Sequence, residues 1–93
     1  MVVGMMRWDL SLPGVDSLKE KRMVVRSLKD RITHRFKVSV AETNHQDQWT
    51  RAQIAVALVA TDAAHAEEVL DKVDQLVRQE GRALILNHYR ELY

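Results

Sequence analysis

The sequence predicts an α+β fold with the element order β-α-β-β-α-β, a four-stranded antiparallel sheet and two helices on one face. Apolar and polar residues alternate in three segments, a fourth segment near the end of the chain is also expected to be a strand, and apolar residues recur at helical spacing in two others. Because crossover connections are right-handed, both helices reach the same face of the sheet, as in the ferredoxin-like split βαβ. The 93 residues have room for one such domain, so residues 1–93 are expected to form a single unit.

The first strand is expected over residues 2–12, followed by a helix that ends near Arg35. One face of the strand is apolar and consists of Met6, Trp8, Leu10 and Leu12. Ser17 and Glu20 have the spacing of a capping box, in which the Glu20 carboxylate reaches back to the N–H of Ser17. The apolar side of the helix consists of Leu18, Val24, Val25, Leu28 and Ile32. These patterns indicate a half-buried strand followed by a helix with one buried side.

The remaining elements follow the same periodicities. A second strand is expected at residues 36–41, a polar turn at "ETNHQDQW" (42–49), and a third strand at 51–61 with Ile54, Val56 and Leu58 facing inward. Asp62 is an expected N-cap and Gly81 an expected C-cap of the second helix. Its buried side consists of Ala66, Val69, Leu70, Val73, Leu76 and Val77. The last strand, 83–92, has no cleanly apolar parity, which indicates a bulge or an exposed edge.

Composition narrows the class of protein. Charged residues make up 29% of the chain and hydrophobic residues 46%, which is typical of a soluble globular protein. Cysteine is absent, which excludes disulfides and thiolate metal sites and fits a cytoplasmic protein. The start "MVVGMMRWDL" has neither the basic flank nor the cleavage site of a signal peptide, and no apolar run suits a membrane span. We therefore expect no membrane partner.

The net charge of +1 conceals an uneven distribution. Residues 1–37 hold nine Lys and Arg against four Asp and Glu, whereas residues 38–93 hold five against nine. Most of the basic excess lies on the first helix, where Lys19, Arg22, Arg26 and Lys29 fall within about 80° of one another on a helical wheel. Lys21, Arg31 and Arg35 flank the apolar side. The chain thus has a local basic patch.

Four stretches together resemble the YlxP-like family of small bacterial proteins: "SLKEKRMVVRSLKDRI", "FKVSVAE", "HQDQWTRAQIAVALVATDAAH" and "VLDKVDQLV". The resemblance covers nearly the whole chain and preserves spacing. It implies a ferredoxin-like fold, in agreement with the periodicities, and a domain of unknown function. Genes of the family commonly lie among those for transcription, translation initiation and ribosome maturation, which implies structured RNA or a ribosomal particle as partner.

The basic helix is our leading candidate for a nucleic-acid site. The candidate phosphate contacts are Lys19, Lys21, Arg22, Arg26 and Lys29. Rows of cations gain affinity for a phosphate backbone by releasing counterions. The alternative is an ordinary solvated helix face, since Lys and Arg are good helix formers. The central strands carry no outward aromatics and no GXXG loop is present, so recognition would use phosphates and shape rather than bases.

The polar turn carries the second group of candidates. Glu42, His45 and Asp47 could bind a metal or transfer protons, but they are also ordinary turn residues without H-x-x-x-H spacing. We favour a structural or partner-contact role for His45, Asp47 and Trp49, and we assign neither a metal site nor a cofactor. Asp62 and His65 are explained by helix capping.

Enzymatic readings have little support. The chain has no P-loop, no dinucleotide fingerprint and no nucleophile–base pair, so we assign no catalytic residue. A phosphate-handling hydrolase is the remaining enzymatic alternative, because acylphosphatases share the expected fold and bind phosphate after the first strand. Here that loop, "LPGVDS", lacks the glycine-rich cradle and an arginine. We expect a non-enzymatic protein.

A binding module of another class is the main competitor of the RNA hypothesis. The outer sheet face is expected to carry small apolar side chains, namely Val3, Met5, Ala55, Ala57 and Val59. Such a face suits a flat partner, including a second copy of the chain as a homodimer. The alternative function is therefore a structural or regulatory module that binds a protein or itself through the open sheet and the 43–49 turn.

Overall fold

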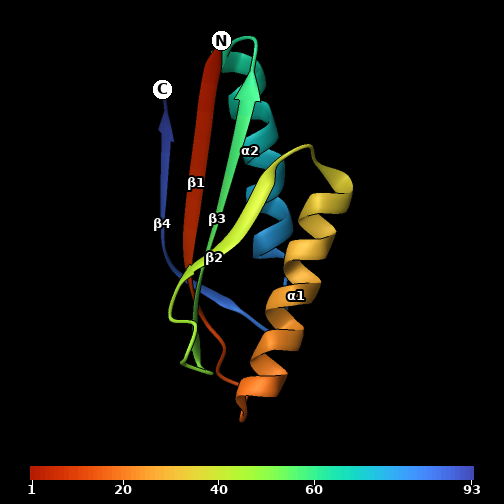
Figure 1. Cartoon of the computed structure of the whole chain (residues 1–93), viewed down its shortest axis with the longest axis vertical. Coiled ribbons are helices and arrows are strands. Elements are labelled where there is room, and N and C mark those ends of the chain that lie inside the picture. Colours follow the sequence, from red (N-terminus) through yellow and green to blue (C-terminus); the bar gives the residue numbers. More distant parts are fainter.

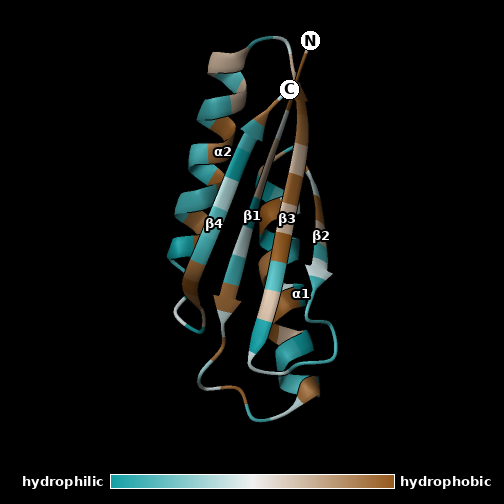
Figure 2. Ribbon diagram, turned by 90° about the vertical axis from the view of Figure 1, so that its left-hand side faces the viewer, coloured by the Kyte–Doolittle hydropathy of each residue, from teal (hydrophilic) through white to brown (hydrophobic).

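The computed structural model describes all of residues 1–93 and confirms the ferredoxin-like order (Figure 1). The elements are β1 (Val2–Ser11), α1 (Leu18–Arg35), β2 (Ser39–Asn44), β3 (Arg51–Ala60), α2 (Ala63–Arg78) and β4 (Leu84–Leu92). The sheet order is β2-β3-β1-β4 with every neighbouring pair antiparallel. Both helices cover one face, and Figure 2 shows the strands in front of them with the opposite face open. Neither helix is long and apolar enough to cross a membrane.

The core lies between the sheet and the two helices. It contains 19 buried hydrophobic residues, and the alternation expected for β1 and β3 is confirmed, since Met6, Leu10, Ile54 and Val56 are all buried. Trp8 is fully buried in this core, and its Nε1 donates to Asp74 Oδ1 at 2.8 Å. A buried indole N–H needs such a partner, so this bond ties β1 to α2.

Both predicted N-caps are present. The Ser17 Oγ accepts from the Glu20 N–H at 3.1 Å, and the Asp62 Oδ1 accepts from the His65 N–H at 2.8 Å. The reciprocal half of the capping box differs from the prediction. The Glu20 carboxylate accepts from the N–H of Asp16, at 3.4 Å, rather than from that of Ser17. The helix starts therefore depend on their caps as the sequence indicates.

The predicted strand at 36–41 is displaced along the chain. Phe36 is the C-cap of α1, where its N–H donates to the Ile32 carbonyl, and pairing with β3 begins at Ser39 and continues to Asn44. Glu42 to Asn44, predicted as a turn, are therefore strand residues. The bulge predicted for the last strand is confirmed. It lies between Ile85 and Asn87, which pair with Leu10 and Asp9 of β1.

The predicted glycine C-cap of the second helix is wrong. The helix ends at Arg78, Gln79 is its C-cap in the right-handed region, and Gly81 has no positive φ. The turn is held instead by the Glu80 carboxylate, which accepts from the Arg82 N–H at 2.9 Å. Because the Glu80 side chain bonds the backbone N–H of this turn, the chain leaves the helix without the left-handed conformation that favours glycine.

Candidate nucleic-acid interface

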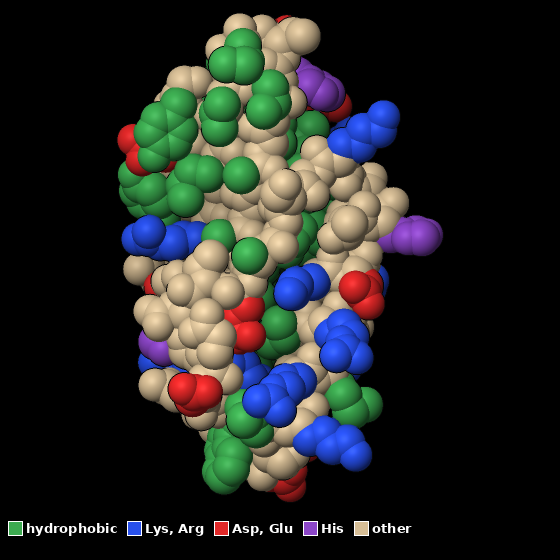
Figure 3. Space-filling model, viewed as in Figure 1, with side chains coloured by type: hydrophobic (Ala, Val, Ile, Leu, Met, Phe, Trp, Pro, Cys, Tyr) green, Lys and Arg blue, Asp and Glu red, His purple; other side chains and the backbone are tan.

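Four cations line one side of α1, as predicted from the helical wheel. Lys19, Arg22 and Arg26 are exposed and Lys29 is half-buried. None of the four takes part in an ion pair. Figure 3 shows Lys and Arg side chains following α1 along this face of the molecule. We call these four residues the α1 stripe.

Most other cations of the chain have an acidic partner. Six Lys and Arg residues form ion pairs, namely Lys21, Arg31, Lys72, Arg78, Arg82 and Arg90. Arg7 has no acidic partner, but it lies over the Tyr89 ring with its guanidinium carbon 4.9 Å from the centroid. The positive charge of the α1 stripe is thus not neutralised by the protein itself, and its side chains are free to meet an external anion.

Lys21 was predicted as a phosphate contact, and this assignment is wrong. Its side chain is fully buried, and its Nζ lies 2.7 Å from Glu42 Oε2. The same ammonium donates to the His45 carbonyl. A buried charge requires partners of this kind, and both come from β2 and the turn that follows it. Lys21 therefore fastens the first helix to the edge strand.

A signal for this burial is present in the sequence. Lys21 precedes Val25 by four residues and Leu28 by seven, which is the spacing of the buried side of α1. A lysine among apolar residues at that spacing indicates a buried charge and hence a carboxylate partner. Glu42 was among the candidate residues, but its assignment to a turn concealed its position beside α1.

The three partner-contact candidates share the turn between β2 and β3, which Figures 1 and 2 place beside the first half of α1. His45 has a φ of 63° and is the only non-glycine residue in the left-handed region. Its N–H donates to Asn44 Oδ1 at 2.8 Å, and its carbonyl accepts from the Gln48 N–H at 3.0 Å as well as from Lys21. Asp47 is exposed, and 51% of Trp49 is exposed.

Glu42, His45 and Asp47 do not come together as a ligand set. Glu42 is engaged by Lys21, and no group of three His, Asp or Glu side chains in the chain has a geometry that could hold a metal ion. The turn therefore presents an exposed indole on a backbone that a buried lysine holds in place.

The α1 stripe borders a groove at the free edge of the sheet. The groove has a volume of about 380 Å³. It is lined by Arg22, Val25, Arg26, Lys29, Asp30 and Glu42. Its wall on the sheet side belongs to β2, which is an edge strand. Three of the four stripe residues, Arg22, Arg26 and Lys29, thus line a groove, and Lys19 lies outside it.

The most strongly perturbed carboxyl lies away from the stripe and was not predicted. Only 5% of Glu80 is exposed, and it accepts from Arg31 and from the N–H, Nε and Nη2 of Arg82. These hydrogen bonds, from Arg82 first and Arg31 next, lower the pKa of Glu80 to about 2 against the opposing effect of burial. Glu80 thereby joins α1 to the turn between α2 and β4.

The open sheet face carries the apolar surface that the sequence predicted, with two additions. Val59 is 68% exposed, and Val3 and Met5 beside it are half-buried. Tyr89 and Tyr93, from β4 and the residue after it, are 41% and 68% exposed and both donate to the Glu91 carboxylate. Sequence reasoning missed these tyrosines because the bulge in β4 breaks its parity. Figure 3 shows hydrophobic side chains gathered over one end of the sheet.

The architecture defines a ferredoxin-like α+β protein, and comparison with solved structures agrees. The chain resembles LarC2, the C-terminal domain of a cyclometallase involved in the synthesis of the NPN cofactor of lactate racemase, with a TM-score of 0.56 and 10% identity. This match covers 100% of the present chain but only 55% of that chain. SnoaB, a cofactor-independent oxygenase from Streptomyces nogalater, has a TM-score of 0.54 and 10% identity, over 99% and 90% of the two chains. These likenesses show the fold alone.

The chain belongs to the DUF503 family, described as a protein of unknown function, which it matches over residues 3–90. It is 31% identical over 72 residues to the uncharacterized protein YlxP of Bacillus subtilis (strain 168). The aligned region is 77% of this chain and 78% of that protein. The YlxP-like resemblance inferred from the sequence is therefore confirmed.

Proposed function

We propose that this protein is a non-enzymatic RNA-binding protein that contacts structured RNA or a ribosomal particle through the α1 stripe. One observation carries the proposal. The four cations of the stripe have no acidic partner, whereas six other Lys and Arg residues of the same chain do. Unpaired cations in a row suit a phosphate backbone, because binding releases the counterions condensed on it.

The mode of binding follows from what surrounds the stripe. The central strands β1 and β3 present no aromatic side chain on the open face, and Tyr89 and Tyr93 belong to the edge strand β4 and the residue after it, so the stacking platform of an RNA-recognition motif is absent. Contacts through the α1 stripe would fix the position of the RNA without reading its sequence. The expected preference is for structured RNA over any particular sequence. Affinity should fall with salt, with a log–log slope of about −3 for four phosphate contacts.

Filter binding to double-stranded RNA and co-sedimentation with ribosomal subunits test the proposal. Changing Lys19, Arg22, Arg26 and Lys29 together to Gln keeps length and helix propensity but removes four charges. We expect RNA affinity to fall by at least about tenfold at physiological salt, with an unchanged circular dichroism spectrum. A folded quadruple variant that still binds RNA and co-sediments would contradict the proposal.

A second candidate function, self-association through the open sheet face, is favoured by a separate observation. Val59 and Tyr93 are each 68% exposed, and they lie side by side with Val3, which pairs with both. An apolar patch on an uncovered sheet suits a second copy of the chain. Sedimentation equilibrium distinguishes this candidate. A dimer that persists at high salt and is lost on Val59→Lys supports it, and a monomer at high protein concentration contradicts it.

A further inference from the structure

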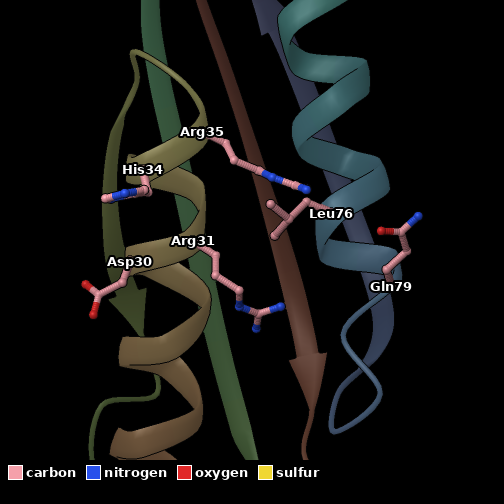
Figure 4. A pocket seen from close by; sticks show the side chains of 6 residues that line it. All are labelled: Asp30, Arg31, His34, Arg35, Leu76 and Gln79. Carbon is pink, nitrogen blue, oxygen red and sulfur yellow. The ribbon is translucent and has the colours of Figure 1, made fainter.

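A groove between the two helices lies apart from the α1 stripe. Its cavity has a volume of about 530 Å³, and its lining is Asp30, Arg31, His34, Arg35, Leu76 and Gln79. Figure 4 shows the side chains of Arg31 and Arg35 extending from α1 toward α2, and the Leu76 side chain projecting from α2 in the space between the two arginines. In the same view Asp30, the one carboxylate of the lining, points away from α2. The interior of the groove is therefore basic.

The groove continues along α2. A second cavity of about 560 Å³ shares Arg35, Leu76 and Gln79 with the first. It adds Phe36, Lys72 and Gln75 to the lining. Cavities of about 300–1,000 Å³ are the usual size of small-molecule sites, and such sites combine apolar walls with a few polar groups. Arg35 stands where the two cavities meet.

The two arginines differ in how they are held. Arg31 is fixed by a contact from its Nη2 to Glu80 and by its Nε, which donates to the Ser27 carbonyl at 3.3 Å. Glu80 also pairs with Arg82, so this cluster of one carboxylate and two arginines keeps a net positive charge. Arg35 has no acidic partner. A guanidinium held in place beside a free one is suited to grip a phosphate through paired N–H donors.

We propose that the groove between α1 and α2 binds a small phosphate-bearing ligand of nucleotide size. Its phosphate group would lie between Arg31 and Arg35, and its ring system would pack against Leu76 and Phe36. The amides of Gln75 and Gln79 line the same groove and supply hydrogen bonds to polar ring atoms. This site does not depend on RNA binding by the α1 stripe, because the two use different cations on different sides of the helix.

Helix electrostatics offer a simpler explanation, against which the proposal must be tested. His34 and Arg35 lie in the last turn of α1, where a cation interacts favourably with the helix dipole. On that explanation Arg35 contributes to stability and the groove remains without a ligand. The two explanations differ in one observable, which is whether the wild-type protein binds a phosphate compound at all.

Isothermal titration calorimetry with adenosine 5′-monophosphate provides the test, with inorganic phosphate and adenosine as separate titrants. We expect a Kd for the nucleotide between about 10 μM and 1 mM, and weaker binding of either part alone. Arg35→Gln should weaken nucleotide binding at least about tenfold, as expected for loss of a charged hydrogen-bond partner. Arg7→Gln, on the open face of the sheet, removes another exposed cation without an acidic partner; it is the control and should bind as the wild type does.

Three outcomes would overturn this inference. The first is the absence of nucleotide binding at millimolar concentration, with Arg35→Gln merely lowering the melting temperature, which would leave the helix-dipole explanation. The second is equal weakening by Arg35→Gln and Arg7→Gln, which would indicate nonspecific attraction. The third is displacement of the nucleotide by double-stranded RNA, which would assign the groove to RNA phosphates. RNA binding by Arg35→Gln is measured in parallel and should equal that of the wild type. A loss of nucleotide binding alone then concerns the groove, and a lack of RNA binding concerns the proposed function.

Discussion

Lys21 and Arg22 are neighbours in the sequence and have opposite surroundings in the structure. Lys21 is fully buried against Glu42 and the His45 carbonyl, whereas Arg22 is exposed and has no acidic partner. Pairing between elements recurs elsewhere, since Arg31 and Arg90 pair with carboxylates of other elements, whereas Lys72 and Arg78 pair within α2. The number of basic residues in a helix therefore says little about its role. A carboxylate partner marks a cation that helps to hold the fold, and an exposed cation without one keeps its full charge for an external anion.

The largest expected effect comes from the buried pair. Lys21→Ala leaves the Glu42 carboxylate and the His45 carbonyl without their partner, and it should lower the free energy of unfolding by about 3–5 kcal/mol. The double variant Lys21→Met/Glu42→Leu, which removes both charges and keeps the volume, should recover most of that loss. Urea unfolding followed by circular dichroism measures both. A loss below about 1 kcal/mol in the single variant would show that this pair does not fasten α1 to β2.

The next effect is a loss of stability in acid that depends on Glu80. Its pKa is about 2 in the folded protein against an ordinary 4.5, so the unfolded chain takes up the proton more readily. The stabilisation is fully present above pH 4.5 and disappears as the pH falls toward 2. The ionised Glu80 contributes at most about 3 kcal/mol to the free energy of unfolding, because solvent around the half-exposed arginines screens the interaction.

Glu80→Gln provides the comparison for this pH dependence. The variant should be less stable than the wild type at pH 7, and the difference should shrink as the pH is lowered from 4.5 toward 2. Equilibrium unfolding curves recorded across that range measure it. A difference that stays constant with pH would mean that the arginines around Glu80 do not stabilise its charged form.

The smallest effect concerns a cap that carries no net charge. Ser17→Ala removes the oxygen that accepts from the Glu20 N–H, and it should cost about 1 kcal/mol. Ser39→Ala, at an exposed position at the start of β2, is the matched control and should stay within about 0.5 kcal/mol of the wild type. Thermal melts compare the melting temperatures of the two variants. Equal melting temperatures would contradict a stabilising cap at Ser17.

The sequence predicted the elements that periodicity controls and missed those that distant partners control. The inward parity of β1 and β3 and both N-caps depend on residues within a few positions, so they could be predicted. The bounds of β2 depend on its pairing with β3, and the exit from α2 depends on Glu80, which no local rule indicates.

For the site, the position of the α1 stripe on one side of the helix could be predicted, but the pairing of the other cations could not. Arg31 and Glu80 are separated by 49 positions in the chain, so their contact exists only once the helices pack. Lys21 is the exception. Its spacing from Val25 and Leu28 indicated the buried side of α1, but it was predicted to be an exposed phosphate contact.

Two double variants with the same change in charge test the central claim most directly. Arg22→Gln/Arg26→Gln removes two unpaired cations, and Lys72→Gln/Arg78→Gln removes two that pair with Glu68 and Asp74. The first should reduce the salt slope of binding to double-stranded RNA by about 1.5 and leave the free energy of unfolding within about 0.5 kcal/mol of the wild type. The second should leave the slope unchanged and lower the free energy of unfolding by up to about 1 kcal/mol. Equal losses of RNA binding in the two variants, or binding unaffected in the first, would contradict the assignment of unpaired cations to RNA.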